Sequence, residues 1–340
     1  MADQHPVLFL THRGERHQQA ALGAAPAELV VTMRRSPTRE EVLALIHSAE
    51  FLVTERTGDI DAGIIAAGKK LRLIQRLGSR TYDIDLGAAR CAGVPVCYLP
   101  VRGCINVAEH MLLQMLALSK RLREQMDLVS AGDDWGRPRL CDEDTFAYNW
   151  TARRNVRSLW GSTVGILGFG EIGAELARLL KPFGCRILYT KRTRLPEAAE
   201  AEYGVQFSTN AEIAASSDSV CMLLPYFEET RQSLGGDFFS AMKPGAFFVS
   251  CGGSGVVDET ALASACAVGH LGGAALDTFT NEPVTPDDPM VALARDPRSN
   301  VVLTPHTAAG AEAANRIERQ EDYDNLLRAL RGEPLVGRVA

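Results

Sequence analysis

A short glycine-rich turn near the middle of the chain constrains the fold most. An apolar run at residues 164–167 leads into the turn, and residues 174–180 follow it with helical spacing. A strand, a G-x-G-x-x-G turn and a helix in this order are typical of dinucleotide sites, where the glycines permit a sharp turn, close approach of a pyrophosphate and close packing of the helix on the strand. The N–H groups that open the helix would face the phosphates. A purely structural glycine turn is the alternative, but the flanking strand and helix favour a nucleotide site formed by Gly168, Phe169, Gly170, Glu171, Ile172 and Gly173.

Short apolar runs alternate with helix-like segments on both sides of this turn. The runs lie at residues 7–10, 51–53, 71–74, 185–189, 219–225, 246–249, 273–277 and 300–304. This alternation predicts an α/β protein with parallel sheets. We expect a doubly wound Rossmann cofactor domain at residues 107–309. A smaller flavodoxin-like α/β substrate domain would be formed by residues 1–106 and 310–340, with a cleft between the two domains.

Three further segments complete the predicted organisation. Residues 107–123 have the spacing of a long helix that connects the domains, and residues 312–330 have that of a helix returning to the first domain. Residues 130–160 show little periodicity and indicate an extended arm. Ligands of such sheets bind at the carboxyl ends of the strands, so the strand-end residues are expected to meet in one crevice. These residues are Lys191, Leu224, Cys251, Asp277 and His306.

The composition restricts the class of partner. The 340 residues carry a net charge of -6 with scattered basic residues, which argues against nucleic-acid binding and favours a small-molecule substrate. No apolar stretch is long enough to cross a bilayer, and the first residues do not follow the pattern of a signal peptide, so we expect a cytoplasmic protein without membrane contact. The eight cysteines show no C-x-x-C spacing. We therefore predict neither a metal site nor disulfides.

The strand end after the glycine turn informs the choice of cofactor. An NAD site usually has an acid about twenty residues beyond the turn, whereas a 2′-phosphate favours arginine. Here the strand runs into Lys191-Arg192-Thr193-Arg194, with no acid. We therefore favour NADP(H) over NAD(H), with Lys191, Arg192 and Thr193 as contacts. A solvated basic strand end is the alternative, and Glu171 complicates the choice because a carboxylate in the turn would lie near the pyrophosphate.

Several blocks, in this order and spacing, resemble the D-isomer-specific 2-hydroxyacid dehydrogenases over nearly the whole chain. They are Tyr82-Asp83-Ile84-Asp85, Val107-Ala108-Glu109-His110, the glycine turn, Leu224-Pro225 with Glu229-Thr230-Arg231, Gly255-Val256-Val257-Asp258-Glu259, residues 275–283 and Leu303-Thr304-Pro305-His306. The resemblance implies hydride transfer between a nicotinamide and a carbonyl or hydroxyl carbon of a small acid. It also implies a homodimer to which the arm contributes. The cofactor segment looks most like the NADP(H)-using glyoxylate/hydroxypyruvate reductases.

The resemblance also assigns roles to particular residues. His306 matches the family's acid/base, and Glu282 matches the carboxylate that hydrogen-bonds it. A histidine suits proton exchange with a carbonyl oxygen because its ordinary pKa lies near neutrality. Taken alone, a strand-end histidine is more often a packed or capping residue, and a glutamate before proline is more often a solvated acid of a loop. Asp277 would contact the nicotinamide amide or, alternatively, cap a turn. The remaining cofactor contacts expected from the matched blocks are Leu224, Pro225, Thr230, Cys251, Gly252 and His306.

The chain departs from the family at the catalytic arginine. That position is Gly253, and the added glycines suggest either close approach of a backbone or room for a bulkier substrate. We hypothesise that Arg80, next to Ser79, or less favourably Arg102, supplies the missing positive charge to the substrate. The alternative is that Arg80 and Arg102 are both surface arginines without a role in substrate binding. Substrate-binding positions are therefore predicted at Ser79, Arg80, Arg102 and Gly253.

Two functions remain open from the sequence. The first is an NAD(P)-dependent oxidoreductase that uses His306 and Glu282 on a 2-hydroxy or 2-keto acid-like substrate. The second is a catalytically weak nucleotide-binding sensor or corepressor-like scaffold, in which the bound nucleotide shifts an assembly equilibrium. Retention of His306 and Glu282 favours the enzyme, and Gly253 favours the sensor.

Overall fold

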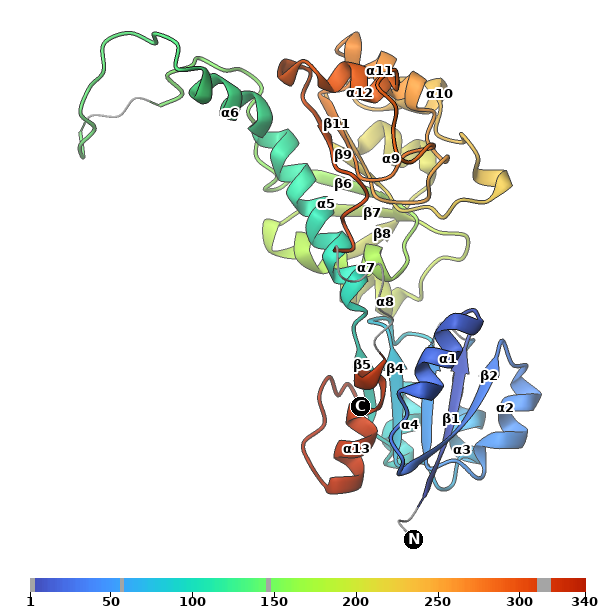
Figure 1. Ribbon diagram of the computed structural model, residues 1–340. Coiled ribbons are helices and arrows are strands. Elements are labelled where there is room, and N and C mark those ends of the chain that lie inside the picture. The colour runs from blue at the N-terminus through green and yellow to red at the C-terminus, as the bar shows by residue number, and fades with distance from the viewer. Residues whose placement is uncertain (1–3, 56–57, 145–147, 311–318) are drawn as a thin grey trace. The chain divides into compact units, whose positions relative to one another are not determined.

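The computed structural model describes residues 4–55, 58–144, 148–310 and 319–340. The chain divides into two compact units, Met1–Ile105 with Gly310–Ala340, and Asn106–Ala309. Their limits differ by one residue from those expected. Each unit is built around one parallel sheet with helices between its strands (Figure 1). The predicted class, two parallel-sheet α/β domains, is therefore confirmed.

The first unit holds a five-stranded sheet in the order β2-β1-β3-β4-β5. Its strands are β1 (His5–Thr11), β2 (Leu29–Arg35), β3 (Phe51–Glu55), β4 (Leu73–Leu77) and β5 (Val96–Leu99). Its helices are α1 (Glu15–Gly23), α2 (Arg39–Ile46), α3 (Ala62–Ala67), α4 (Leu86–Ala92), the 3-10 turn η4 (Gln320–Tyr323) and α13 (Asp324–Arg331). All residues of β3 and β4 are buried, as expected for parallel strands covered on both faces.

The second unit holds a seven-stranded sheet in the order β12-β11-β10-β9-β6-β7-β8. The strands are β6 (Thr163–Leu167), β7 (Arg186–Thr190), β8 (Val205–Phe207), β9 (Ser219–Met222), β10 (Phe247–Ser250), β11 (Gly273–Leu276) and β12 (Val301–Leu303). The α-helices are α5 (Arg102–Lys120), which begins in the first unit, α6 (Leu122–Ala131), α7 (Glu171–Leu180), α8 (Glu197–Tyr203), α9 (Asn210–Ser216), α10 (Gly236–Ala241), α11 (Glu259–Ala267) and α12 (Pro289–Ala294). The 3-10 turns are η1 (Lys181–Phe183), η2 (Glu228–Thr230) and η3 (Pro297–Ser299).

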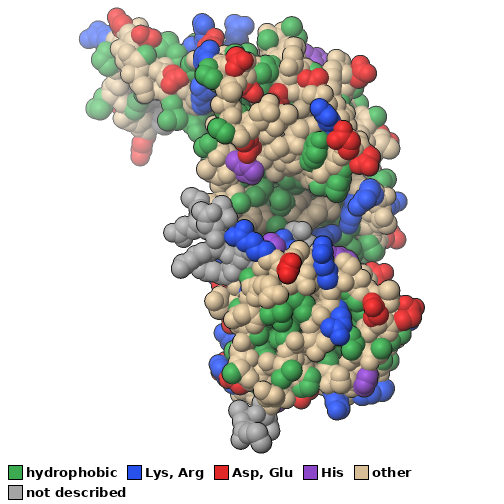
Figure 2. All heavy atoms as spheres, turned by 45° about the vertical axis from the view of Figure 1, so that its right-hand side comes forward, with side chains coloured by type: hydrophobic (Ala, Val, Ile, Leu, Met, Phe, Trp, Pro, Cys, Tyr) green, Lys and Arg blue, Asp and Glu red, His purple; other side chains and the backbone are tan. Residues whose placement is uncertain are grey.

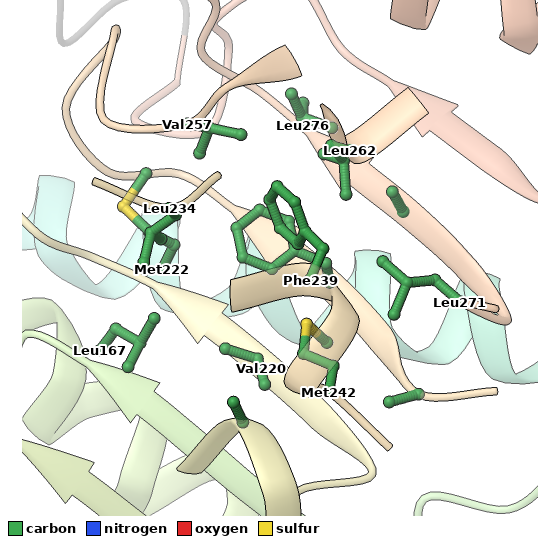
Figure 3. Packing of buried hydrophobic residues seen from close by; sticks show 14 of the residues in the cluster. Leu167, Val220, Met222, Leu234, Phe239, Met242, Val257, Leu262, Leu271 and Leu276 are labelled. Carbon is green, nitrogen blue, oxygen red and sulfur yellow. The ribbon is translucent and has the colours of Figure 1, made fainter. Parts of the chain in front are cut away.

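Apolar side chains from the central strands and from α9 to α12 form the main core of the second unit. Phe239 of α10 lies among Val220, Met242 and Leu262 (Figure 3), and all four are buried. On another side of β9, Met115 of α5 packs with its sulfur 3.6 Å from the sulfur of Cys221. This packing holds the central strands in place, and with them the loops that follow their carboxyl ends.

The helical segments differ from prediction at two places. The helix expected over 107–123 ends at Lys120, because Arg121 adopts φ 50, and α6 begins immediately after it. Of the helix expected over 312–330, residues 312–318 lie outside the described residues, and the part that follows forms η4 and α13. The described residues after α6, 132–144 and 148–158, form an extended arm that projects from their unit (Figure 1).

The charged side chains on the surface and the lengths of the helices bear on possible partners. Cationic and anionic side chains are interspersed over the face shown in Figure 2. Among the described helices, none combines the length and the apolarity that crossing a bilayer requires.

Candidate nucleotide and acid/base site

The glycine turn joins β6 to α7 as predicted. Gly168 has φ 92, and a Cβ there would lie 2.9 Å from the backbone of Leu223. A Cβ on Gly173 would lie 3.3 Å from the ring of Phe169, so this glycine allows the helix to pack on the strand. Gly170 faces open space and, as the N-cap residue of α7, supplies no side-chain cap. The first N–H groups of the ten-residue helix are thus suited to an anionic group such as a phosphate.

Two residues of the turn have buried side chains. The ring of Phe169 is 1% exposed and packs 4.9 Å from the ring of Tyr189 and 5.6 Å from that of Tyr203. Its backbone N–H donates to the carbonyl of Thr190. The Phe169 side chain therefore belongs to the core, and the predicted cofactor contact of this residue stays a prediction for its backbone. Glu171 is also buried, so its carboxylate does not point outward into solvent.

The basic strand end carries fewer uncommitted charges than its sequence suggested. Arg194 donates from Nε and Nη2 to both carboxylate oxygens of Glu200, at 2.9 and 2.7 Å. The same carboxylate accepts from the hydroxyl of Tyr189 at 2.8 Å, and the arginine lowers the pKa of Glu200. The charge of Arg194 is therefore compensated. Two further cations lie at this strand end beside Thr193, namely the half-buried Lys191 and the exposed Arg192.

The loops after β9 and β10 pack backbone against backbone. The N–H of Gly253 donates to the carbonyl of Leu224 at 2.8 Å. A Cβ on Gly253 would lie 2.2 Å from the nitrogen of Tyr226, and one on Gly255, which has φ 83, would lie 3.1 Å from the Tyr226 ring. The expectation that Gly253 leaves room for a bulkier substrate is wrong at this position, because Pro225 and Tyr226 fill the space that a side chain would enter. The other interpretation of these glycines, close approach of a backbone, agrees with the structure, because the backbone of Pro225 and Tyr226 lies against Gly253.

Other predicted cofactor contacts in these loops have local partners. The hydroxyl oxygen of Thr230 accepts from the N–H of Phe227 at 2.8 Å and lies 3.0 Å from the carbonyl oxygen of Pro225, so it braces the β9 loop. A Cβ on Gly252 would lie 2.6 Å from the sulfur of Met222. The thiol of Cys251 donates to Gln114 Oε1 at 3.5 Å, and burial raises the pKa of this thiol.

The two residues predicted as an acid/base pair lie together. Nδ1 of His306 is 2.7 Å from Oε2 of Glu282, although the residues are 24 positions apart in sequence. The other oxygen, Oε1, accepts from the N–H of Phe279 at 2.9 Å, which orients the carboxylate. With Nδ1–H donating to Glu282, Nε2 is the nitrogen that can exchange a proton with a ligand. The His306 side chain is 56% exposed and so accessible to one.

Asp277, at the end of β11, holds the turn that carries His306. Its Oδ1 accepts from the Thr304 hydroxyl at 2.6 Å and from the N–H of Thr307 at 3.0 Å, and its Oδ2 accepts from the N–H of Ala308 at 2.9 Å. His306 itself has φ 53, a left-handed conformation that few non-glycine residues adopt. Of the two roles considered for Asp277, turn capping is the one that its hydrogen bonds describe.

The predicted substrate residues of the first unit lie in different environments. Ser79 and Arg80 follow β4, with Ser79 buried, and Arg80 Nη1 donates to the Tyr82 hydroxyl at 2.7 Å. The Arg80 guanidinium also lies 5.7 Å from the centre of the Tyr82 ring, so its direction is fixed. Arg102 is 79% exposed and pairs with Glu321. The surface reading therefore fits Arg102, whereas Arg80 is held by its neighbours.

Together, the two parallel sheets, the open helix start at Gly170 and the histidine–carboxylate pair define a nucleotide-binding α/β protein of the dehydrogenase type. The model of the D-isomer specific 2-hydroxyacid dehydrogenase NAD binding domain matches residues 112–308. The chain belongs to this family, which confirms the resemblance read from its motifs.

Individual relatives agree with this membership. A glyoxylate reductase from Korarchaeum cryptofilum is 31% identical over 87% of this chain and 84% of its own length. A D-3-phosphoglycerate dehydrogenase from Mycobacterium leprae is 30% identical over 96% of this chain but only 57% of its own length, so the chain spans little more than half of that relative. The PH0520 protein from Pyrococcus horikoshii OT3 has a similar structure, with a TM-score of 0.57, 27% identity and coverage of 99% of this chain and 95% of that one.

Proposed function

We propose that the protein is an NAD(P)-dependent oxidoreductase that interconverts a carbonyl and a hydroxyl group of a small 2-keto or 2-hydroxy acid. The observation that carries this proposal is the 2.7 Å contact between His306 Nδ1 and Glu282 Oε2 on a strand-end loop of the same sheet as the glycine turn. A sensor or scaffold would not require an accessible imidazole whose second nitrogen is held by an oriented carboxylate.

The residues present fit a bound dinucleotide. The open face of Gly170 and the uncapped start of α7 would receive the pyrophosphate, and the cofactor would supply or accept the hydride. His306 Nε2 would give a proton to the carbonyl oxygen during reduction and take it back during oxidation. Glu282 would fix the tautomer of His306 and stabilise its protonated form. Ser79 and Arg80 of the first unit would bind the carboxylate of the substrate.

Replacing either member of the pair is expected to lower turnover strongly without abolishing nucleotide binding. His306→Gln and Glu282→Gln should each lower kcat for glyoxylate by roughly 100-fold or more, the usual contribution of a positioned acid/base. The exposed His47 provides a matched control as His47→Gln. The measurements are steady-state turnover and NAD(P)H affinity by fluorescence. Wild-type protein that binds nucleotide but reduces neither glyoxylate nor longer 2-keto acids would support the corepressor-like alternative instead.

Arg80 is expected to supply the positive charge that the family's arginine would provide at position 253. Loss of one charge-assisted hydrogen bond to a carboxylate should raise KM for glyoxylate roughly tenfold or more in Arg80→Ala. The exposed Arg35→Ala is the control. Adding Gly253→Arg to the Arg80→Ala variant should not restore activity, because the backbone of Tyr226 occupies the space of the new side chain. Unchanged kinetics in Arg80→Ala would remove this residue from the mechanism.

We further propose NADP(H) as the preferred cofactor, supported by Lys191 and Arg192 at the carboxyl end of β7. Arg192→Gln should weaken NADPH binding about tenfold, the size of one lost charge-assisted contact, and leave NADH binding unchanged. Arg186→Gln, at the opposite end of the same strand, is the matched control. Dissociation constants for both nucleotides decide the matter, and tighter binding of NADH by the wild-type protein would refute the preference.

A homodimer that uses α6 and the arm is proposed from the apolar side chains exposed there. Met126 and Val129 on α6 are 60% and 59% exposed, and Trp160 is 71% exposed. Met126→Glu should shift the protein from dimer to monomer in sedimentation equilibrium, because a charge would enter the buried core of an interface. Val268→Glu, at a more exposed apolar position (79%) beyond α11, should leave the mass unchanged. A monomeric wild-type protein would exclude the dimer.

A further inference from the structure

Three polar side chains of α5 lie four residues apart and contact the segment that carries His306. Asn106 Nδ2 donates to the carbonyl of Ala309 at 3.0 Å. His110 Nε2 lies 2.9 Å, and Gln114 Nε2 3.3 Å, from the hydroxyl oxygen of Thr304. A spacing of four places the three residues on one face of the helix. This polar stripe, residues 106, 110 and 114, thus holds both ends of the segment 304–309.

The direction of these hydrogen bonds can be assigned. The single proton of the Thr304 hydroxyl goes to Asp277 Oδ1, because an ionised carboxylate only accepts. Thr304 Oγ1 therefore accepts from His110 and Gln114. Gln114 is oriented independently, since its carbonyl oxygen accepts from the Cys251 thiol. His110 must then carry a proton on Nε2, and a donor chain runs from His110 through Thr304 to Asp277.

We propose that His110 is a positioning residue for the acid/base His306. This inference rests on the proposed function of His306. His110 Nε2 contacts the Thr304 hydroxyl and also lies 3.6 Å from Asp277 Oδ1, and Asp277 binds the N–H groups of the two residues that follow His306. Because His306 adopts a left-handed φ between these anchors, a displaced Thr304 would turn the imidazole of His306 away from its reacting position.

A residue buried only for packing would not need this chemistry. The His110 side chain is 14% exposed, and Gln114 beside it is buried. An apolar side chain could fill the same volume, but it would remove the stronger of the two donors to Thr304. Replacing the histidine by an apolar residue should therefore affect the orientation of His306 more than the stability of the fold.

The test compares His110→Leu, which removes the donor, with His110→Gln, which keeps a donor at similar reach. His110→Leu should lower kcat for glyoxylate roughly 10- to 100-fold, as expected for misplacement of a catalytic group. NADPH affinity and KM should stay unchanged, and His110→Gln should recover most of the activity. Leu113→Ala, an exposed position on the same helix, is the control and should match wild type.

A second readout does not require turnover. In ¹⁵N-histidine NMR, the His306 signals, assigned with His306→Asn, should shift or broaden in His110→Leu and stay in place in Leu113→Ala. Unchanged kcat and unchanged His306 signals in His110→Leu would overturn the positioning role. If the wild-type protein reduces no carbonyl compound, the proposed function fails, while the NMR comparison still decides whether His110 positions His306.

Discussion

The carboxylate of Asp277 is the interaction on which the arrangement at His306 depends. It is 1% exposed and gathers the Thr304 hydroxyl and two backbone N–H groups into one turn. Burying a charged group without hydrogen bonds is costly, so these three donors and the carboxylate require one another. The turn they form is what brings His306 to Glu282, a residue contributed by the loop after β11. The pair is therefore a product of strand order and buried hydrogen bonding rather than of local sequence.

Much of the architecture could be predicted from the sequence because it depends on local patterns. The glycine turn, the apolar central strands and the motif around His306 each show their structure over a few residues. Three edge strands, β2, β5 and β8, were missed. β8 has only three residues, with a glutamine between its two apolar ones, and β5 has only four residues. The break at Arg121 was also missed, because no glycine or proline marks it.

The candidate site was less accessible to sequence reasoning wherever it depends on long-range contacts. The roles of Thr304 and His110 follow from hydrogen bonds across 190 or more residues, and spacing alone gives no sign of them. The ion pair between Arg194 and Glu200 could not be predicted for a related reason, since only the fold of β7 and α8 brings the two side chains together. A sequence pattern can locate a charged residue such as Arg194, but only the structure shows whether a nearby group of opposite charge already pairs with it.

The packing of the β9 loop on Gly252, Gly253 and Gly255 has an evolutionary consequence. A Cβ on Gly252 or Gly253 would meet an occupied position, and one on Gly255 would be strained by its φ of 83, so a single nucleotide change that installs a larger residue is poorly tolerated at each. An arginine at position 253 would therefore need the opposing loop to change as well. Viable sequence changes in the two loops are expected to occur together rather than one at a time.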